Sequence, residues 1–390
     1  MKKLLLTVVL TAAFFTGLLF AMKVTFHLPG LLQPVEETIA PVPPEDFEET
    51  GYYYVRLTDA EKAAYAAIVR QAEDFPEEIE IPPLETEQLG RVVKALSLDH
   101  PMLYLYNQGV TLARHDNKYF FAPHYSCTKE EYETTKDRVE QTVQRILAQT
   151  PDGSDYDKEL YLHDYLTGHC RYDEKETGAD NDNPAGALLN GCAICSGYAK
   201  AYKLLLDAVG IENTLLTGKT SEDGGDPVAH IWNAVKLNGA WYYVDVTWDD
   251  PIMENDGAGL PLSSHNYFNV TDAMLAPTHS DYEFDYPCDD ESLFYYRVND
   301  AYLTGDDDVV RFVADLIAAA GKEGRDYIDF KCESDGVYKA AIKKLFTNEK
   351  IYRAINNANL KLSRKFGSRS VQYSVDDANR RIIILFNHKS

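Results

Sequence analysis

The sequence predicts an α+β protein, in which a helix-rich central region and a β-hairpin are flanked by a small mixed module at each end. Apolar residues recur at helical spacing in several segments, residues 131–149 among them. Short strand-like runs occur in groups, and Asn238-Gly239 separates two of them as a hairpin turn would. Hydrophobic residues make up 45% of the 390 positions, which is enough for a sizeable core and excludes wholesale disorder.

The charge of the chain is strongly acidic and unevenly distributed. With 38 Lys and Arg against 62 Asp and Glu, the net charge is −24, which argues against nucleic acid as a partner. Residues 322–390 are instead net positive, with 15 Lys and Arg against 8 Asp and Glu. This contrast predicts separate modules. We expect the basic end to dock either on an anionic wall polymer or on the acidic remainder of its own chain.

The first residues predict export. Lys2 and Lys3 precede an uncharged stretch of 19 residues, Leu4 to Met22, which lies within the roughly 17–25 residues that span a bilayer. Such a stretch is typical of a membrane anchor or of a signal segment that is cleaved. The paired lysines favour a cytosolic amino end. We therefore expect an extracellular or cell-surface protein, with membrane contact through residues 4–22 if they are retained.

The pattern along the chain predicts five segments. Residues 1–22 are the signal or anchor, 23–50 a Pro/Glu-rich linker, 51–130 an N-terminal α+β module, 131–290 the central domain and 291–390 a C-terminal α/β module. Within these, Thr58 and Glu61 resemble a capping box. The expected helices are 59–72, 86–98, 131–149, 158–168, 306–320, 335–346 and 349–362, and the expected strands outside the hairpin are 103–106, 119–122, 370–375 and 381–386.

A buried helix is predicted to begin close to Cys195 and to stop at Gly210. A thiol at the amino end of a helix meets the positive end of the helix dipole and unpaired backbone N–H groups. Both favour the nucleophilic thiolate, and the same N–H groups can later donate to an oxyanion. An isolated cysteine in such a place is more often an inert core residue, so a neighbouring base decides between the two interpretations.

The hairpin over residues 229–248 supplies that base. With Asn238-Gly239 as a two-residue loop, Trp232 faces Asp245 across the hairpin, and His230 lies two residues from Trp232 on the same face. His230 and Asp245 are then diagonal neighbours, with Cα atoms roughly 7–8 Å apart, close enough for a hydrogen bond between their side chains. An aspartate in an apolar strand is costly unless it is paired. The register therefore predicts a His230–Asp245 pair.

Three motifs together resemble the transglutaminase-like superfamily of papain-like cysteine enzymes. They are Cys195-Ser196-Gly197-Tyr198-Ala199, His230-Ile231-Trp232-Asn233 and Val244-Asp245-Val246-Thr247-Trp248-Asp249-Asp250-Pro251, in family order. The resemblance extends over about residues 131–287. It implies a core in which the nucleophile helix packs on an antiparallel sheet, with Cys195 as nucleophile, His230 as base and Asp245 as the group that orients the histidine. A second oxyanion donor is expected upstream of Cys195, within residues 183–190, but the sequence does not indicate which residue it is.

The resemblance implies acyl transfer through a thioester on Cys195. With water as acceptor the enzyme is a cysteine protease or amidase, and with a lysine amine it is a cross-linker. We expect hydrolysis, with proteins or wall peptides at a bacterial cell surface as substrates. The alternative is a catalytically idle binding module that uses the same groove. The intact triad favours the enzyme, and the oligomeric state is not predicted.

Three further groups of side chains lie in or near these motifs. Trp232 shares a face with His230 and is expected to wall the substrate groove, with packing alone as an equal alternative. Cys192 and Cys195 form a C-x-x-C motif, and a disulfide between them would inactivate the nucleophile. A zinc site at this motif would need a second pair of ligands, and the sequence has no second paired motif. Asp249 and Asp250 are read as solvated acidic residues rather than calcium ligands. The sequence thus predicts no cofactor and no metal.

Overall fold

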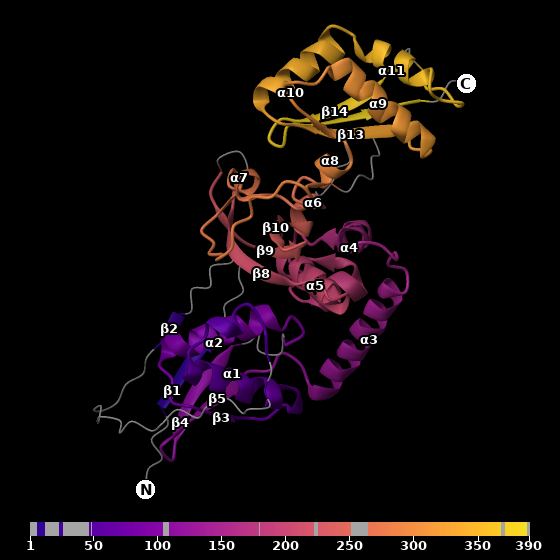
Figure 1. Cartoon of the computed structure of the whole chain (residues 1–390). Coiled ribbons are helices and arrows are strands. Elements are labelled where there is room, and N and C mark those ends of the chain that lie inside the picture. The colour runs from indigo at the N-terminus through magenta and orange to yellow at the C-terminus, as the bar shows by residue number, and fades with distance from the viewer. Residues whose placement is uncertain are drawn as a thin grey trace. The chain divides into compact units, whose positions relative to one another are not determined.

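The structure is a computed structural model (Figure 1) that describes residues 6–11, 23–25, 47, 49–103, 109–178, 180–221, 225–250, 264–367 and 371–387. The chain divides into two compact units, Met1–Asp289 and Asp290–Ser390, and each is described by itself. Helices and largely antiparallel sheets together make an α+β fold, as the sequence predicts. The finer division of the first unit at residue 130 stays a prediction.

The N-terminal part of the first unit is a five-stranded sheet with the order β2-β1-β4-β5-β3. Its elements are β1 (Leu6–Thr11), β2 (Lys23–Thr25), η1 (Tyr54–Arg56), α1 (Asp59–Gln71), η2 (Ala72–Asp74), β3 (Ile79–Ile81), α2 (Thr86–Asp99), β4 (Val110–His115) and β5 (Lys118–Pro123). Helix α1 begins with the predicted Thr58–Glu61 capping box. The strand expected at 103–106 falls mainly on residues outside the described ones. The strand that pairs with β5 in this position is β4, which the sequence analysis missed.

The predicted membrane segment is described only in part. Leu6–Thr11 forms β1, which pairs antiparallel with β4, and residues 4–5 and 12–22 lie outside the described ones. Among the residues that the structure describes, no helix is both long and apolar enough to cross a membrane. Export and anchoring therefore stay predictions. Most of the predicted linker, residues 26–46, also lies outside the description.

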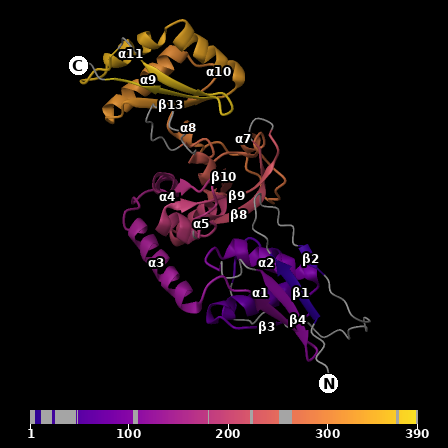
Figure 2. The same cartoon turned by 180° about the vertical axis from the view of Figure 1, so that it is seen from behind.

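Helix α3 (Lys129–Leu147) ties the N-terminal part to the central domain within the first unit (Figure 2). Near its start, Tyr132 packs into the same apolar core as α1 and α2. Farther along, α3 contacts the short helix η4 (Gly186–Asn190) and helix α5 (Cys195–Ala208). One helix thus contributes to both cores.

The central domain is built on an antiparallel sheet with the order β10-β9-β8-β11. The strands are β8 (Asn213–Thr220), β9 (Val228–Leu237), β10 (Ala240–Val244) and β11 (His279–Ser280). The remaining elements are α4 (Asp155–His169), β6 (Arg171–Tyr172), β7 (Cys192–Ala193), α6 (Val246–Asp249) and α7 (Asp272–Leu275). Helix α5 packs on β8 and β9. The predicted arrangement of a nucleophile helix on an antiparallel sheet is therefore confirmed.

The β9–β10 hairpin has the predicted register but a shorter second strand. Ala240 pairs with Leu237 across the Asn238-Gly239 turn. The strand was expected to continue to Trp248, yet it ends at Val244. Asp245 ends it because its carboxylate accepts the backbone N–H groups of Thr247 and Trp248, and this N-cap begins helix α6.

The second unit is a four-stranded sheet with helices. It contains α8 (Tyr295–Val298), β12 (Tyr302–Leu303), α9 (Val309–Lys322), β13 (Tyr327–Cys332), α10 (Asp335–Ile342), η5 (Lys343–Thr347), α11 (Ile351–Asn359), β14 (Gln372–Asp376) and β15 (Arg381–Leu385), in the sheet order β12-β13-β15-β14. The three predicted helices and two predicted strands are all present. Strand β13, which lies in the middle of the sheet, was not predicted.

Candidate active site

The first turn of α5 presents Cys195 at the amino end of the helix. Ile194 is the N-cap residue and no side chain caps this end. The backbone N–H of Ile194 donates to Asn181 O at 2.9 Å, which seats the helix start on the turn over residues 180–183. Gly197 allows this contact, because a Cβ at that position would lie 2.4 Å from Asn181 O. Cys195 is therefore held by close backbone packing, with first-turn N–H groups beside its thiol.

His230 and Asp245 form the predicted pair. His230 Nε2 lies 2.6 Å from Asp245 Oδ2, and the two side chains are 6% and 1% exposed. Because Asp245 occupies Nε2, the nitrogen left for the thiol is Nδ1, and His230 makes a side-chain hydrogen bond with Cys195. The structure therefore brings Cys195, His230 and Asp245 together in the order nucleophile, base and carboxylate.

The electrostatics of this pair favour a charged imidazolium. Burial alone would lower the pKa of His230, but the charge and hydrogen bond of Asp245 outweigh it and raise the pKa to about 10, with Cys195 contributing in the same direction. Burial alone would likewise raise the pKa of Asp245. The charge of His230, together with hydrogen bonds from His230 and His279, holds that pKa well below its usual range.

His279 falls within the region of resemblance, but the sequence analysis gave it no role in the site. Its Nε2 lies 3.0 Å from Asp245 Oδ2, the same oxygen that binds His230, and its ring is fully buried. Burial lowers the pKa of His279, and the neighbouring His230 adds to this effect. No motif marks His279, because it comes from β11, at the opposite edge of the sheet from β10.

The expectation that Trp232 walls a substrate groove is not met in this structure. Trp232 is 0% exposed, and its ring stacks on His230 at a centroid distance of 6.0 Å, so it packs beneath the base. Trp248 is half-buried and its centroid lies 6.2 Å from that of His230. Trp248 was expected on the opposite face of the strand from His230. Because the chain turns into helix α6 after Asp245, Trp248 leaves the strand and lies beside the histidine ring.

Cys195 itself is only 7% exposed. It belongs to an apolar cluster with Ala199, Leu215, Ile231 and Leu98, the last of which comes from α2 in the N-terminal part. Tyr53 packs on the same cluster, and its hydroxyl donates to Leu215 O at 2.8 Å. Two segments of the N-terminal part thus lie in contact with the core that holds the nucleophile.

The acidic residues after the hairpin are a buried Asp249 and a half-buried Asp250, whereas solvated positions were expected for both. Asp249 is 0% exposed, accepts the backbone N–H of Tyr267 at 3.0 Å and lies 3.2 Å from His163 Nε2. Asp250 accepts a short hydrogen bond from the Tyr198 hydroxyl. Burial, opposed by that bond, raises the pKa of Asp250 to about 6. The acidic pair is therefore part of the internal structure that supports the active-site turn.

Two groups of side chains among the described residues have the composition and spacing to hold a metal ion. One is the catalytic group itself, made of His230, Asp245 and His279, and the other is His163, Asp164 and His265. All six cysteines are free thiols. Cys192 lies on β7 and is half-buried, three residues before Cys195.

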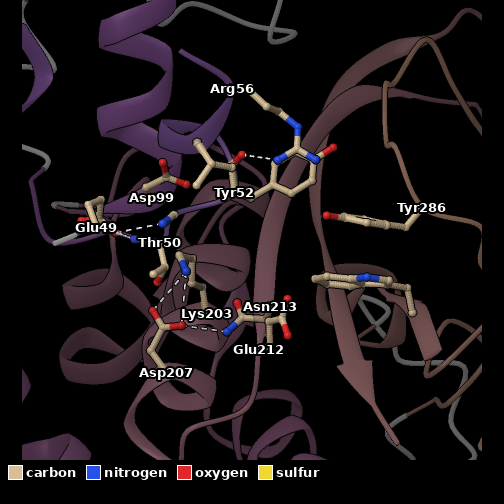
Figure 3. A pocket seen from close by; sticks show the side chains of 13 residues that line it. Glu49, Thr50, Tyr52, Arg56, Asp99, Lys203, Asp207, Glu212, Asn213 and Tyr286 are labelled. Atoms are coloured by element: carbon tan, nitrogen blue, oxygen red, sulfur yellow. Dashed lines mark hydrogen bonds and ion pairs between the residues drawn. The ribbon is translucent and has the colours of Figure 1, made fainter. Parts of the chain in front are cut away.

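A cavity of about 330 Å³ lies on another part of the first unit (Figure 3). Tyr52, Trp241 and Tyr286 provide aromatic walls, and the acidic groups include Glu49 and Asp207. None of the triad residues lines it. Its lining residues on α5 lie eight or more positions beyond Cys195, or roughly 12 Å along a helix. The cavity is therefore not the catalytic centre.

Comparison with known proteins finds a family match within the central domain. Residues 137–246 match the core described as Transglutaminase-like superfamily. Kyphoscoliosis peptidase of Mus musculus is 22% identical over 153 residues, covering 36% of this chain and 23% of that protein. The Homo sapiens protein of the same name is 20% identical over 152 residues, with the same coverages of 36% and 23%. This chain therefore covers less than a quarter of the length of these relatives.

A solved structure of a TGase is also similar, with 15% identity and a TM-score of 0.26 over 42% of this chain and 48% of that one. The matched family core contains the helix start with Cys195, the strand with His230 and the turn with Asp245. The match thus shows a transglutaminase-like core at residues 137–246, which make up less than half of the chain.

Proposed function

We propose that this chain is a thiol acyl-transfer enzyme that hydrolyses amide or peptide bonds through a thioester on Cys195. The observation that carries the proposal is the contact between the buried His230–Asp245 pair, 2.6 Å apart, and a thiol at the start of α5. A structural cysteine has no need of a histidine whose other nitrogen is fixed by a buried carboxylate. A nucleophile requires both.

In the first half-reaction, Cys195 Sγ attacks the carbonyl carbon of the substrate after its proton passes to His230 Nδ1. The backbone N–H groups of the first turn of α5 donate to the oxyanion. As the C–N bond breaks, His230 returns the proton to the leaving amine or ammonia. A thioester on Cys195 and a neutral imidazole remain.

In the second half-reaction, His230 takes a proton from water while the water oxygen attacks the thioester carbon. The C–S bond breaks, the carboxylic acid leaves, and the thiol regains its proton from His230. Asp245 stays ionised throughout and keeps Nδ1 turned toward the sulfur. If a primary amine takes the place of water, the same steps produce a cross-link in place of a free acid.

Export to the cell surface and protein or wall-peptide substrates complete the proposal. They rest on the uncharged segment over residues 4–22, which follows two lysines. The competing function is an idle binding module in which the same residues recognise a peptide without reacting. Reactivity of the thiol distinguishes the two.

The test is alkylation of the full-length protein by iodoacetamide across pH, with each cysteine quantified by peptide mapping. Because the pKa of His230 is held near 10, its imidazolium persists through neutral pH and stabilises the thiolate. Cys195 should therefore react well below the free-thiol pKa of about 8.5, and His230→Ala should abolish that low-pH reactivity. Half-buried Cys192 is the internal control, and its alkylation should be the same in both proteins.

A Cys195 that reacts only near pH 8.5, and equally with or without His230, would refute the enzymatic proposal in favour of the binding module. If the thiol is activated, a second assay assigns the acceptor. Ammonia or amine release from peptide amides is measured with and without a primary amine. Incorporation of the amine at the expense of free acid would identify a cross-linker in place of a hydrolase.

A further inference from the structure

A second cluster of imidazole and carboxylate groups lies apart from the triad in the first unit. His163 and Asp164 are consecutive residues of α4, and His265 comes from the segment between α6 and α7. Asp164 Oδ1 lies 3.0 Å from His163 Nδ1 and 2.8 Å from His265 Nε2. One donor atom from each residue lies within 4.8 Å of the other two. Two rings therefore converge on one carboxylate oxygen, and their own donor nitrogens lie within 4.8 Å of each other.

The donor set determines which ion suits the cluster. Two imidazole nitrogens and one carboxylate oxygen suit Zn²⁺ and neighbouring transition metals, whereas Ca²⁺ and Mg²⁺ prefer oxygen ligands. Zinc bonds of about 2.0–2.2 Å at tetrahedral angles place the ligand atoms roughly 3.3 Å apart. The observed separations of 2.8 and 3.0 Å would need to widen by only a few tenths of an ångström.

His163 is already oriented as a metal ligand would be. Its Nε2 lies 3.2 Å from the fully buried Asp249, so that Nδ1 is the nitrogen turned toward Asp164. Asp249 is fixed in turn by the backbone N–H of Tyr267 at 3.0 Å. A carboxylate that holds the far nitrogen of a ligating histidine is a recurrent outer-sphere partner in metal sites. Asp164 and Asp249 also place two carboxylates beside the His163 ring, which favours a divalent cation.

The cluster is open on one side. The side chains of His163 and His265 are 0% and 9% exposed, whereas that of Asp164 is 46% exposed. An ion can therefore approach along the carboxylate, and water can fill the remaining coordination positions. We propose that His163, Asp164 and His265 bind a divalent transition-metal ion of the Zn²⁺ class.

The bound ion would stiffen the turn that carries the triad carboxylate. Asp249, the partner of His163, ends α6 and donates its backbone N–H to Asp245 O at 3.1 Å. Asp245 begins the same turn as its N-cap. The metal is thus proposed as a structural ion, joined to Asp245 through one turn of helix and taking no part in bond breaking.

The experiment uses chelator-treated full-length protein titrated with Zn²⁺ by calorimetry and with Co²⁺ by visible absorption. We expect one ion per chain, an imidazole-type Co²⁺ spectrum and a rise in Tm on metal addition. Asp164→Ala and His265→Gln should each weaken binding at least tenfold and remove the rise in Tm. Asp249→Asn should weaken binding by about 10- to 100-fold, as loss of an outer-sphere partner does.

Two variants serve as matched controls. His169→Gln removes an exposed histidine from the same helix, and His279→Gln disrupts the other potential metal group without touching this one. Both should keep wild-type Zn²⁺ affinity. Every variant is first melted in chelator, which identifies any that fail to fold.

The absence of Zn²⁺ binding by the wild type would overturn the proposal, as would tighter binding of Ca²⁺ than of Zn²⁺. Affinity that survives in folded Asp164→Ala and His265→Gln would do the same, since the ion would then lie elsewhere. Loss of binding in His279→Gln alone would place the ion at the triad. None of these results depends on whether the triad is catalytically active.

Discussion

At the scale of single residues, Asp245 binds both histidines of the active site and the backbone of the turn that follows it. Oδ2 accepts from two histidines, and Oδ1 accepts from the N–H groups of Thr247 and Trp248. One carboxylate therefore orients the base and begins the helix that follows it. Because four donors stabilise its charge, Asp245 remains ionised under conditions in which an isolated buried aspartate would be protonated.

We expect His279→Gln to slow acyl-enzyme formation by roughly tenfold while leaving the protein folded. A hydrogen bond to a charged group contributes about 1.5–3 kcal/mol, part of which the glutamine amide can replace. Asp245 would then hold His230 less firmly. The measurement is the rate of thioester formation together with the pH profile of Cys195 alkylation. A merely structural role for His279 predicts lower stability with an unchanged pH profile.

A second residue-level prediction concerns Glu159. Its side chain is 0% exposed, one oxygen accepts from Asn269 Nδ2 at 2.8 Å, and the other has no hydrogen-bond partner among the described groups. Burial raises the pKa of Glu159 to about 8, despite the opposing hydrogen bond from Asn269. The carboxyl is thus neutral at pH 7 in the folded chain.

The sign of the pH effect follows from that shift. The unfolded chain releases this proton near pH 4.3, so the folded state loses relative stability as the pH rises from there through about 8. Glu159→Gln mimics the neutral form and should gain stability over wild type between pH 5 and about 9. Urea unfolding at several pH values measures this. A constant difference across the range would mean that Glu159 is already ionised in the fold.

At the scale of elements, the start of α5 depends on the absence of a side chain at position 197. A Cβ there would meet Asn181 O at 2.4 Å and the Ala193 Cβ at 2.7 Å. Both neighbours belong to the backbone turn and strand that position the nucleophile. Neither can move without displacing the amino end of the helix.

Gly197→Ala should therefore destabilise the fold by roughly 1–3 kcal/mol, as overpacking does, and should lower the reactivity of Cys195. Gly168→Ala is the matched control. Gly168 also lies in a helix, α4, and a Cβ there meets nothing within 4 Å. The control should stabilise the protein by about 0.5–1 kcal/mol. Equal losses in the two variants, measured by chemical denaturation, would contradict the packing explanation.

The hairpin shows which part of the site is readable from local sequence. Asn238-Gly239 determines the turn, the turn sets the register, and the register places His230 beside Asp245. The same reasoning extended β10 to Trp248, because Val246 and Thr247 have strand propensity. Capping of the N–H groups by Asp245 overrode that propensity. The prediction of the His230–Asp245 pair is nevertheless correct, because β10 ends at Val244, where the register of the hairpin is already fixed.

At the scale of the whole molecule, the acidic net charge of −24 hides a basic module. Within the second unit, a cavity of about 560 Å³ is lined by Arg311, Lys344, Lys350 and Arg353, with Asp308 as its acidic member. Asp308 also caps α9, and the nearby Lys344 lies 3.8 Å from it. Three basic residues of 322–390, joined by Arg311, thus line one hollow surface.

We expect the full-length protein to bind a poly(glycerol phosphate) polymer through this cavity, and binding to weaken as salt rises. Electrostatic attraction at an exposed site is screened over about 8–10 Å at physiological ionic strength. Lys350→Glu and Arg353→Glu should each reduce the affinity. Lys339→Glu, at an exposed position of α10 outside the cavity, changes the net charge by the same amount and should leave the affinity nearly unchanged. An affinity that does not change with ionic strength would contradict electrostatic binding. An affinity that falls equally in all three variants would contradict a site localised at the cavity.

The sequence by itself determined the helix that begins at Cys195, the hairpin register and the His230–Asp245 pair. These depend on contacts between residues near one another in the chain, or on a turn of known geometry. Only the tertiary structure decided that His279 shares Asp245, that Trp232 is buried, and that His163 and His265 converge on Asp164. His279 lies 34 positions from Asp245, and His265 lies 101 positions from Asp164. No local periodicity records such a contact, because packing of separate elements creates it.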